Sequence, residues 1–250
     1  MSRKYRNPPI VEALCEFRFD PGDPWDLAVP GLVYEELGGA GGRFPKRRQA
    51  ANLEVELTLT DSGAQQQVAR SERMQFLRGD EKVLVQIGPN LLAVNHLKPY
   101  SSWQEFFSLV RDGFETYNKV TKPKGVKRIG VRYINRVEIP EPSIRLEDFL
   151  EFRPYMGSNL RQEIAGPFVV GVHIPYEDGR DVLRLQLSSV RKDTPGMALM
   201  LDLDYFLAQP GGVPLGGVLE WNDVAHGRVE EVFEACITDR LRQLFDEVVE

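Results

Sequence analysis

The sequence predicts an α+β fold in which one curved antiparallel β-sheet carries two long helices on one face. Three observations support this fold class. Apolar and polar residues alternate over many short segments, as expected for strands with one buried face. Two longer segments instead repeat apolar residues at helical spacing. The order of these segments in the first half of the chain also recurs in the second half.

The composition is that of a globular protein with a negative net charge. Of its 250 residues, 42% are hydrophobic and 27% charged, and the formal net charge is −6. This charge argues against a protein that coats nucleic acid without sequence preference, because such binding depends on neutralised phosphates. Cys15 and Cys236 both fall on predicted apolar faces, so we expect buried free thiols. We also expect a cytoplasmic protein with no signal peptide and no membrane-spanning segment.

The first half begins with a strand within residues 7–20, NPPIVEALCEFRFD. Its apolar face contains Val11, Ala13, Cys15, Phe17 and Phe19. A helix is expected next, with Asp23 as its N-cap and Pro24 at its first position. The glycine-rich run at 38–42 ends this helix, and a flexible loop follows.

Further strands and a long helix complete the first half. Strands are expected over 52–60, over a hairpin at 74–88 with its turn at Gly79 and Asp80, and over 91–97. Ser102 and Glu105 form a capping box for a helix whose apolar stripe runs to Tyr117.

The second half repeats this order. Residues 126–140 alternate as a strand, and 144–152 form a short helical stretch. Three strands follow, over residues 168–176, 181–191 and 196–207. A last helix is expected from the apolar stripe that runs from Val229 to Val248.

We therefore expect two pseudo-repeats, residues 1–124 and 125–250, that together form one structural domain. Each repeat follows the order β-α-βββ(β)-α. This order resembles the TATA-binding-protein-like fold, a saddle with pseudo-twofold symmetry. A helix-grip-like fold, in which a curved sheet grips long helices, stays open as the alternative.

A second resemblance rests on short motifs. These are the segment 7–13 (NPPIVEA), Glu16-x-Arg18-Phe19, the segment 133–136 (YINR) and the segment 201–204 (LDLD). Together they are similar to a sporadically distributed bacterial family without an established activity. The resemblance implies horizontal transfer, in the setting of mobile elements or defence genes.

Alternation also assigns a set of polar side chains to the sheet face that no helix is expected to cover. The candidate site residues on this face are Glu12, Glu16, Arg18, Arg132, Arg136, Glu138, His173, Arg184, Asp202 and Asp204. One interpretation is a solvated face whose opposite charges pair across strands. The other is a concave binding surface, since arginines recognise carboxylates, phosphates and proteins.

Motifs for catalysis or for a resident cofactor are absent from the sequence. It contains no GxxxxGK[ST], HExxH or GxSxG motif and no CxxC pair. His173, Asp202 and Asp204 would form a metal or acid–base cluster only if their strands were adjacent. We therefore expect no catalytic residue, no metal and no cofactor, and the sequence leaves enzymatic activity open without favouring it.

The leading hypothesis is a non-enzymatic binding or regulatory module that recognises a protein partner through the polar sheet face and flanking loops, including the long loop at 153–167. One alternative is a nucleic-acid-binding saddle, for which Lys46, Arg47 and Arg48 form the only compact basic run, in the loop after the first helix. Another is an anion- or nucleotide-binding protein, or an enzyme, that uses an arginine-lined concavity. No membrane contact is expected, and a homodimer stays open.

Overall fold

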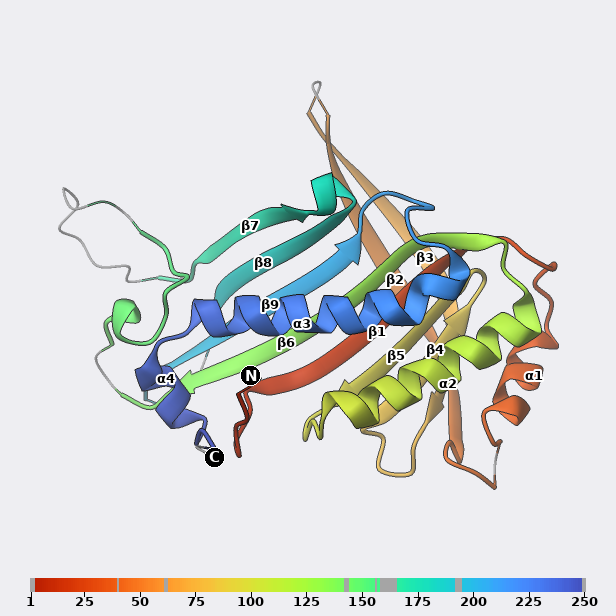
Figure 1. The fold of residues 1–250 in the computed structure, drawn as a ribbon, viewed down its shortest axis with the longest axis horizontal. Helices are drawn as coiled ribbons and strands as arrows, with labels where there is room; N and C mark the ends of the chain where they lie inside the picture. The colour runs from red at the N-terminus through yellow and green to blue at the C-terminus, as the bar shows by residue number, and fades with distance from the viewer. Residues whose placement is uncertain are drawn as a thin grey trace.

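The computed structural model describes residues 3–39, 41–60, 63–141, 144–155, 157, 166–191 and 195–248, and for residues 51–71 the backbone alone. Within these ranges the strands form one open antiparallel sheet with nine strands, in the order β2-β3-β4-β5-β1-β6-β9-β8-β7 (Figure 1). The strands are β1 (Ile10–Asp20), β2 (Lys46–Thr60), β3 (Gly63–Leu77), β4 (Val83–Gly88), β5 (Leu91–Leu97), β6 (Gly125–Ile139), β7 (Val169–Tyr176), β8 (Asp181–Val190) and β9 (Met197–Leu207).

The centre of the sheet joins the two halves of the chain. β1 pairs with β6, which are the first strands of residues 1–124 and 125–250. On its other side, each of these strands pairs with the last strand of its own half, β1 with β5 and β6 with β9. The long central strands therefore bring side chains from both halves onto the same two sheet faces.

Two long helices, α2 (Trp103–Thr121) and α3 (Val218–Cys236), lie on one face of this sheet (Figure 1). The shorter α1 (Val29–Glu36) packs beside α2, and α4 (Asp239–Leu244) follows α3. The predicted α+β class, with one antiparallel sheet and two long helices on one face, is confirmed. Among the described helices, none combines the length and the apolar character needed to cross a membrane.

The core lies between the helices and the sheet. The apolar face of β1 meets α2 through aromatic rings, with Phe17 and Phe114 at 5.4 Å and Phe19 and Tyr117 at 4.9 Å between ring centroids. Burial of an aromatic or large aliphatic side chain of this kind contributes about 1.5–3 kcal/mol. The expected capping of α2 is present, since the Ser102 hydroxyl accepts a hydrogen bond from the Glu105 amide at 3.3 Å.

The first and the last of the expected helices have other bounds in the structure. The first helix begins at Val29, because Asp26 and not Asp23 accepts hydrogen bonds from the first amides, at 2.7 and 3.2 Å. Pro30 then falls in the first turn, where proline is tolerated. The last helix does not run to Val248: it ends at Cys236, where Ile237 is extended and bridges to Leu150.

Several other expected boundaries also shift. β2 begins at Lys46, so the basic run at 46–48 is part of a strand and not of a loop. β3 begins at Gly63, well before the expected start at residue 74. The expected helical stretch at 144–152 contains one 3₁₀ turn, Leu146–Asp148. Most of the long loop at 153–167 lies outside the described residues.

Candidate functional site

The sheet face opposite the helices contains four arginines that lie above three carboxylates. We call Arg18, Arg128, Arg132 and Arg184 the arginine layer. Their side chains are 29–40% exposed, whereas those of Glu16, Asp202 and Asp204 beneath them are only 10–16% exposed. The surface that this cluster presents to solvent is therefore mainly guanidinium.

The tightest contact of the cluster joins β6 to β9. Arg132 donates two hydrogen bonds to Asp202, from Nε at 2.8 Å and from Nη2 at 2.6 Å. This paired geometry holds both planar groups in register. The hydrogen bonds to Asp202 raise the pKa of Arg132 above its ordinary value, although partial burial opposes them.

Asp204 lies between two arginines from neighbouring strands. Its carboxylate is 3.1 Å from Arg128 Nη2 and 3.5 Å from Arg184 Nη2. Burial raises the pKa of the Asp204 carboxyl above its ordinary value, and the charges of Arg128, Arg184 and Arg132 partly offset that effect. The negative charge of Asp204 therefore depends on the guanidinium groups that cover it.

Arg128 reaches across β6 because Gly130 leaves room for it. A Cβ atom on residue 130 would lie 2.7 Å from Arg128 Nη1. The guanidinium also contacts Glu16 on β1 at 3.4 Å and lies 4.9 Å above the Phe206 ring on β9. On the far side, Arg18 Nε donates a hydrogen bond to Glu16 at 2.9 Å. One glycine thus allows an arginine to join both halves of the chain.

A ladder of buried amides continues this face across the first half of the chain. Gln75, Gln86 and Asn95 are 5–9% exposed and link β3, β4 and β5 by hydrogen bonds of 2.8 Å. The ladder ends in two charged residues: Arg48 donates to Gln75 at 2.6 Å, and Asn95 donates to Glu12 at 2.6 Å. Sequence analysis missed this ladder, although Gln86 and Asn95 interrupt otherwise apolar strands.

The remaining predicted face residues lie outside the cluster. Arg136 pairs with Glu138 at 2.8 Å, farther along β6. His173 lies opposite Arg184 on β8, and that strand separates it from Asp202 and Asp204 on β9. The condition for a cluster of His173 with the two aspartates, adjacent strands, is therefore not met, and among the described residues no group of three or more His, Cys, Asp or Glu is arranged to hold a metal.

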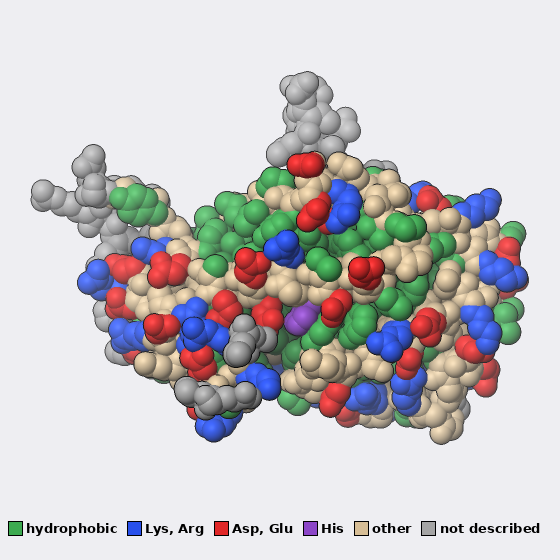
Figure 2. Space-filling view, in the orientation of Figure 1, with side chains coloured by type: hydrophobic (Ala, Val, Ile, Leu, Met, Phe, Trp, Pro, Cys, Tyr) green, Lys and Arg blue, Asp and Glu red, His purple; other side chains and the backbone are tan. Residues whose placement is uncertain are grey.

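The predicted basic run does not form one patch. Arg48 lies on the open face with Gln75, whereas Arg47 lies on the helix side, 5.2 Å above the Tyr34 ring. Lys46 pairs with Glu81 at 2.7 Å. Figure 2 shows the helix side of the molecule, where acidic and basic side chains are interspersed.

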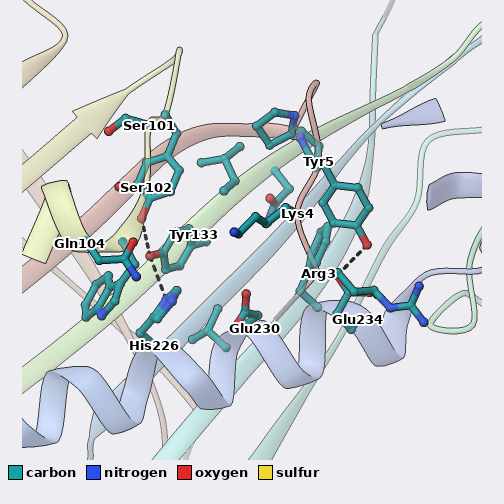
Figure 3. A pocket seen from close by; sticks show the side chains of 18 residues that line it. Arg3, Lys4, Tyr5, Ser101, Ser102, Gln104, Tyr133, His226, Glu230 and Glu234 are labelled. Carbon is teal, nitrogen blue, oxygen red and sulfur yellow. Dashed lines mark hydrogen bonds and ion pairs between the residues drawn. The ribbon is translucent and has the colours of Figure 1, made fainter. Parts of the chain in front are cut away.

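A cavity of about 520 Å³ lies on the helix side, between α3, the start of α2 and the N-terminal segment (Figure 3). We call residues 3–9 the N-terminal strap. Tyr5 of the strap bridges to Glu247, and its hydroxyl donates a hydrogen bond to Glu234 on α3 at 2.7 Å. The strap therefore forms one wall of the cavity, held against α3 and the segment after α4.

One wall of this cavity contains a chain of hydroxyls that ends at an imidazole. The Tyr100 and Tyr133 hydroxyls are 3.0 Å apart, and the Tyr133 hydroxyl is 3.1 Å from His226 Nδ1 (Figure 3). Trp103 stacks on the His226 ring at 4.2 Å. Burial lowers the pKa of His226, although the charges of Glu230 and Asp223 on α3 oppose the shift. Burial thus favours the neutral form of the imidazole, whose Nδ1 faces the Tyr133 hydroxyl.

Sequence analysis missed this second site. Tyr133 and Trp103 lie on apolar faces of an expected strand and an expected helix, where core packing is the usual role, and His226 has no neighbouring ligand residue in the sequence. The three residues come from β6, α2 and α3, so only the folded chain brings them together. Comparisons of the chain with protein-family models and with curated proteins found no match.

Proposed function

We propose that this chain is a non-enzymatic binding module that recognises an acidic segment of a protein partner through its open sheet face. The observation that carries the proposal is the arginine layer, in which guanidinium groups lie above buried carboxylates. Those carboxylates fix the guanidinium orientation before a partner arrives, which reduces the ordering cost of binding. Guanidinium groups held in this way suit carboxylate side chains.

Two observations favour an acidic protein over nucleic acid. The four arginines of the arginine layer and the nearly buried Arg73, which is 4.0 Å from Glu16, face three carboxylates, so the local excess is two positive charges. Nucleic-acid affinity instead depends on many neutralised phosphates. The neighbouring ladder consists of neutral amides and ends at Glu12. The strand order supports a duplicated saddle like that of the TATA-binding-protein-like fold, but a saddle that bends DNA needs an apolar, basic underside.

The resemblance to the sporadically distributed bacterial family extends this proposal to a cellular setting. The partner would then be a cytoplasmic protein encoded with mobile elements or defence genes. Genes fixed beside this one are the first candidates to test.

The test is capture of partners from native cells with matched variants. The first bait is the double variant Arg132→Gln/Arg184→Gln, which removes two guanidinium groups of the arginine layer. The control bait is Arg145→Gln/Arg228→Gln, which removes the same charge from exposed residues elsewhere. We expect a stoichiometric partner with wild type and control, released by a polyglutamate peptide, and lost with the first double variant. Equal capture by all three baits would refute the proposal.

Two further assays separate the alternatives. Binding of a random-sequence oligonucleotide with a steep salt dependence would favour the nucleic-acid saddle. An increase in melting temperature with nucleotides or polyphosphate, lost in the same double variant, would favour anion binding by the arginine layer.

The cavity beneath the N-terminal strap supports a second candidate function, which is binding of a small molecule. The observation that favours it is the hydrogen-bonded chain Tyr100–Tyr133–His226 in the cavity wall. A thermal-shift screen of uncharged and zwitterionic metabolites tests it, with His226→Phe as the variant and His173→Phe as the control. A ligand that stabilises wild type and the control but not His226→Phe supports this function.

A further inference from the structure

The outer edge of β7 is a row of backbone groups that no described strand pairs with, since β7 is the last strand of the sheet. The direction of each group follows from the register with β8. The Phe168 carbonyl accepts a hydrogen bond from the Ser189 amide, so the even-numbered residues of this segment face β8. Val169, Gly171 and His173 therefore direct both N–H and C=O outward.

This edge lacks the features that prevent strands from pairing between molecules. Natural edges often carry charged side chains or bulges along their length. This edge has neither, and its two prolines, Pro167 and Pro175, lie only at the ends of the segment. The opposite edge of the sheet begins with the basic residues 46–48, whereas residues 167–175 contain no Asp, Glu, Lys or Arg. Val169 is 69% exposed and Val172 43% exposed, on opposite faces of β7. Hydrophobic side chains gather on this side of the sheet (Figure 2).

The segment is symmetric about Gly171. Pro167 and Pro175, which have no backbone N–H, lie four residues before and four residues after it. An antiparallel pair of two such segments centred on Gly171 uses every outward N–H between the prolines and places each proline opposite the other, where no donor is needed. A centre moved to Val169 or His173 would place Gly171 opposite Pro167 or Pro175, so the outward Gly171 carbonyl would have no N–H donor.

We propose that β7 pairs antiparallel with β7 of a second copy of this chain, centred on Gly171. On the open face, Val169 lies opposite His173 of the second copy. On the helix side, Val170 lies opposite Val172 of the second copy, which covers the valine that is exposed in the single chain. β-Branched pairs of this kind stabilise antiparallel strands, and no like charges oppose each other.

This pairing has a consequence for the proposed function. An antiparallel pair is related by a twofold axis normal to the sheet, so the open faces of both copies lie on the same side. The dimer then presents two arginine layers on one continuous surface. Pairing of a single strand buries a small area, and we expect a concentration-dependent equilibrium between monomer and dimer.

The first experiment measures mass by analytical ultracentrifugation over a range of concentrations. Wild type is expected to approach twice the 28.4 kDa mass of the chain. Gly171→Pro removes one outward donor without changing a residue that faces β8, and Val172→Lys places a charge at the pair. Both are expected to stay monomeric. Val172→Lys should keep the melting temperature, whereas Gly171→Pro should lower it slightly, because a Cβ atom on residue 171 would lie 3.3 Å from the Leu185 carbonyl oxygen. The control Val224→Lys, at another exposed valine, is expected to dimerise. A monomeric wild type, or a dimer that survives both variants, would overturn the proposal.

The second experiment tests the register and does not depend on the proline variant. In the proposed pair the Cα atoms of residue 171 and its counterpart are about 5.5 Å apart. Gly171→Cys is therefore expected to form a disulfide-linked dimer under mild oxidation. Val169→Cys is the control, because its counterpart lies about 13 Å away along the strands. Cys15 and Cys236 are buried and do not interfere. Equal cross-linking of the two variants would contradict the register, and failure of both would contradict the pairing.

Because these experiments use the purified chain alone, their outcome is independent of partner binding. A dimer that binds no acidic partner would leave this inference intact and refute the proposed function. A monomer that binds the partner would do the reverse.

Discussion

Replacement of Arg132 by methionine tests whether the arginine layer is held by its own carboxylates. The change removes both hydrogen bonds to Asp202 and keeps an apolar stem of similar length. Asp202 is only 13% exposed, and its next cation, Arg184, is 3.8 Å away. Arg132→Met therefore leaves a nearly buried carboxylate without its main partner.

The expected loss follows from the chemistry of the pair. A hydrogen bond to a charged group contributes about 1.5–3 kcal/mol, and a buried group left unsatisfied costs about 1–3 kcal/mol. We expect Arg132→Met to lower the free energy of unfolding by about 2 kcal/mol, which corresponds to about 4–8 °C in melting temperature for a chain of this size. The double variant Arg132→Met/Asp202→Asn should lose less than the sum of the single variants, by about 1–2 kcal/mol.

Urea denaturation of the four proteins in this cycle measures the coupling. The control is Arg136→Met, on the same strand and the same face, because the exposed pair of Arg136 with Glu138 should contribute only about 0.2–1 kcal/mol. If Arg132→Met is no more destabilising than Arg136→Met, or if the two changes at 132 and 202 are additive, the arginine layer is not held in this way.

Three other predictions concern the arginine layer, the ladder of buried amides and the cavity beneath the N-terminal strap. Gly130→Val should displace the Arg128 guanidinium, lower the melting temperature and weaken partner binding, whereas Gly166→Val, which has open space around it, should change neither. Gln86→Leu should cost about 1–3 kcal/mol in urea denaturation because it leaves its amide neighbours unsatisfied. Burial lowers the pKa of His226 below 6.5, so the unfolded chain binds the proton more tightly than the folded chain. The wild type should therefore lose stability as the pH falls below 6.5 toward the folded-state pKa. In melting curves between pH 8 and pH 5, His226→Phe should flatten this dependence. An unchanged slope in that variant would contradict the assignment.

Strands and helices with one buried face could be predicted from the sequence. β1, β6, β8 and β9 alternate apolar and polar residues because each lies between the helices and the open face. The first part of β3 could not be found, because Gly63–Arg73 is polar and shows no alternation. The break after α3 was also hidden, since Ile237 continues the apolar stripe and only its bridge to Leu150, a tertiary contact, ends the helix.

The candidate site could be predicted as a set of residues but not as a network. Alternation assigned Glu16, Arg132 and Asp202 to one face, and the strand register brings them together. The role of Arg128 was missed, because it falls in a run of basic residues that looks like a solvated linker. Which side chains meet on this face also depends on strand order. Because β8 lies between β7 and β9, His173 is separated from Asp202 and Asp204 by a whole strand. Neither this order nor the tertiary position of His226 leaves a local signal in the sequence.

On the open face, Arg132 and Arg184 differ in geometry, and this difference suits one to stability and the other to recognition. Arg132 uses its Nε and one terminal nitrogen on Asp202, so a partner that competes for this guanidinium would have to break a nearly buried pair. Arg184 differs, because its contacts to Asp202 and Asp204 are longer, at 3.8 and 3.5 Å, and its side chain is 38% exposed although its Nε is buried. A guanidinium has five donors, so the terminal nitrogens of Arg184 can donate to a carboxylate of a partner without the loss of a tight pair. Arg132 therefore serves mainly to hold the layer in place, and Arg184 is the arginine at which an acidic partner would make its first strong contact.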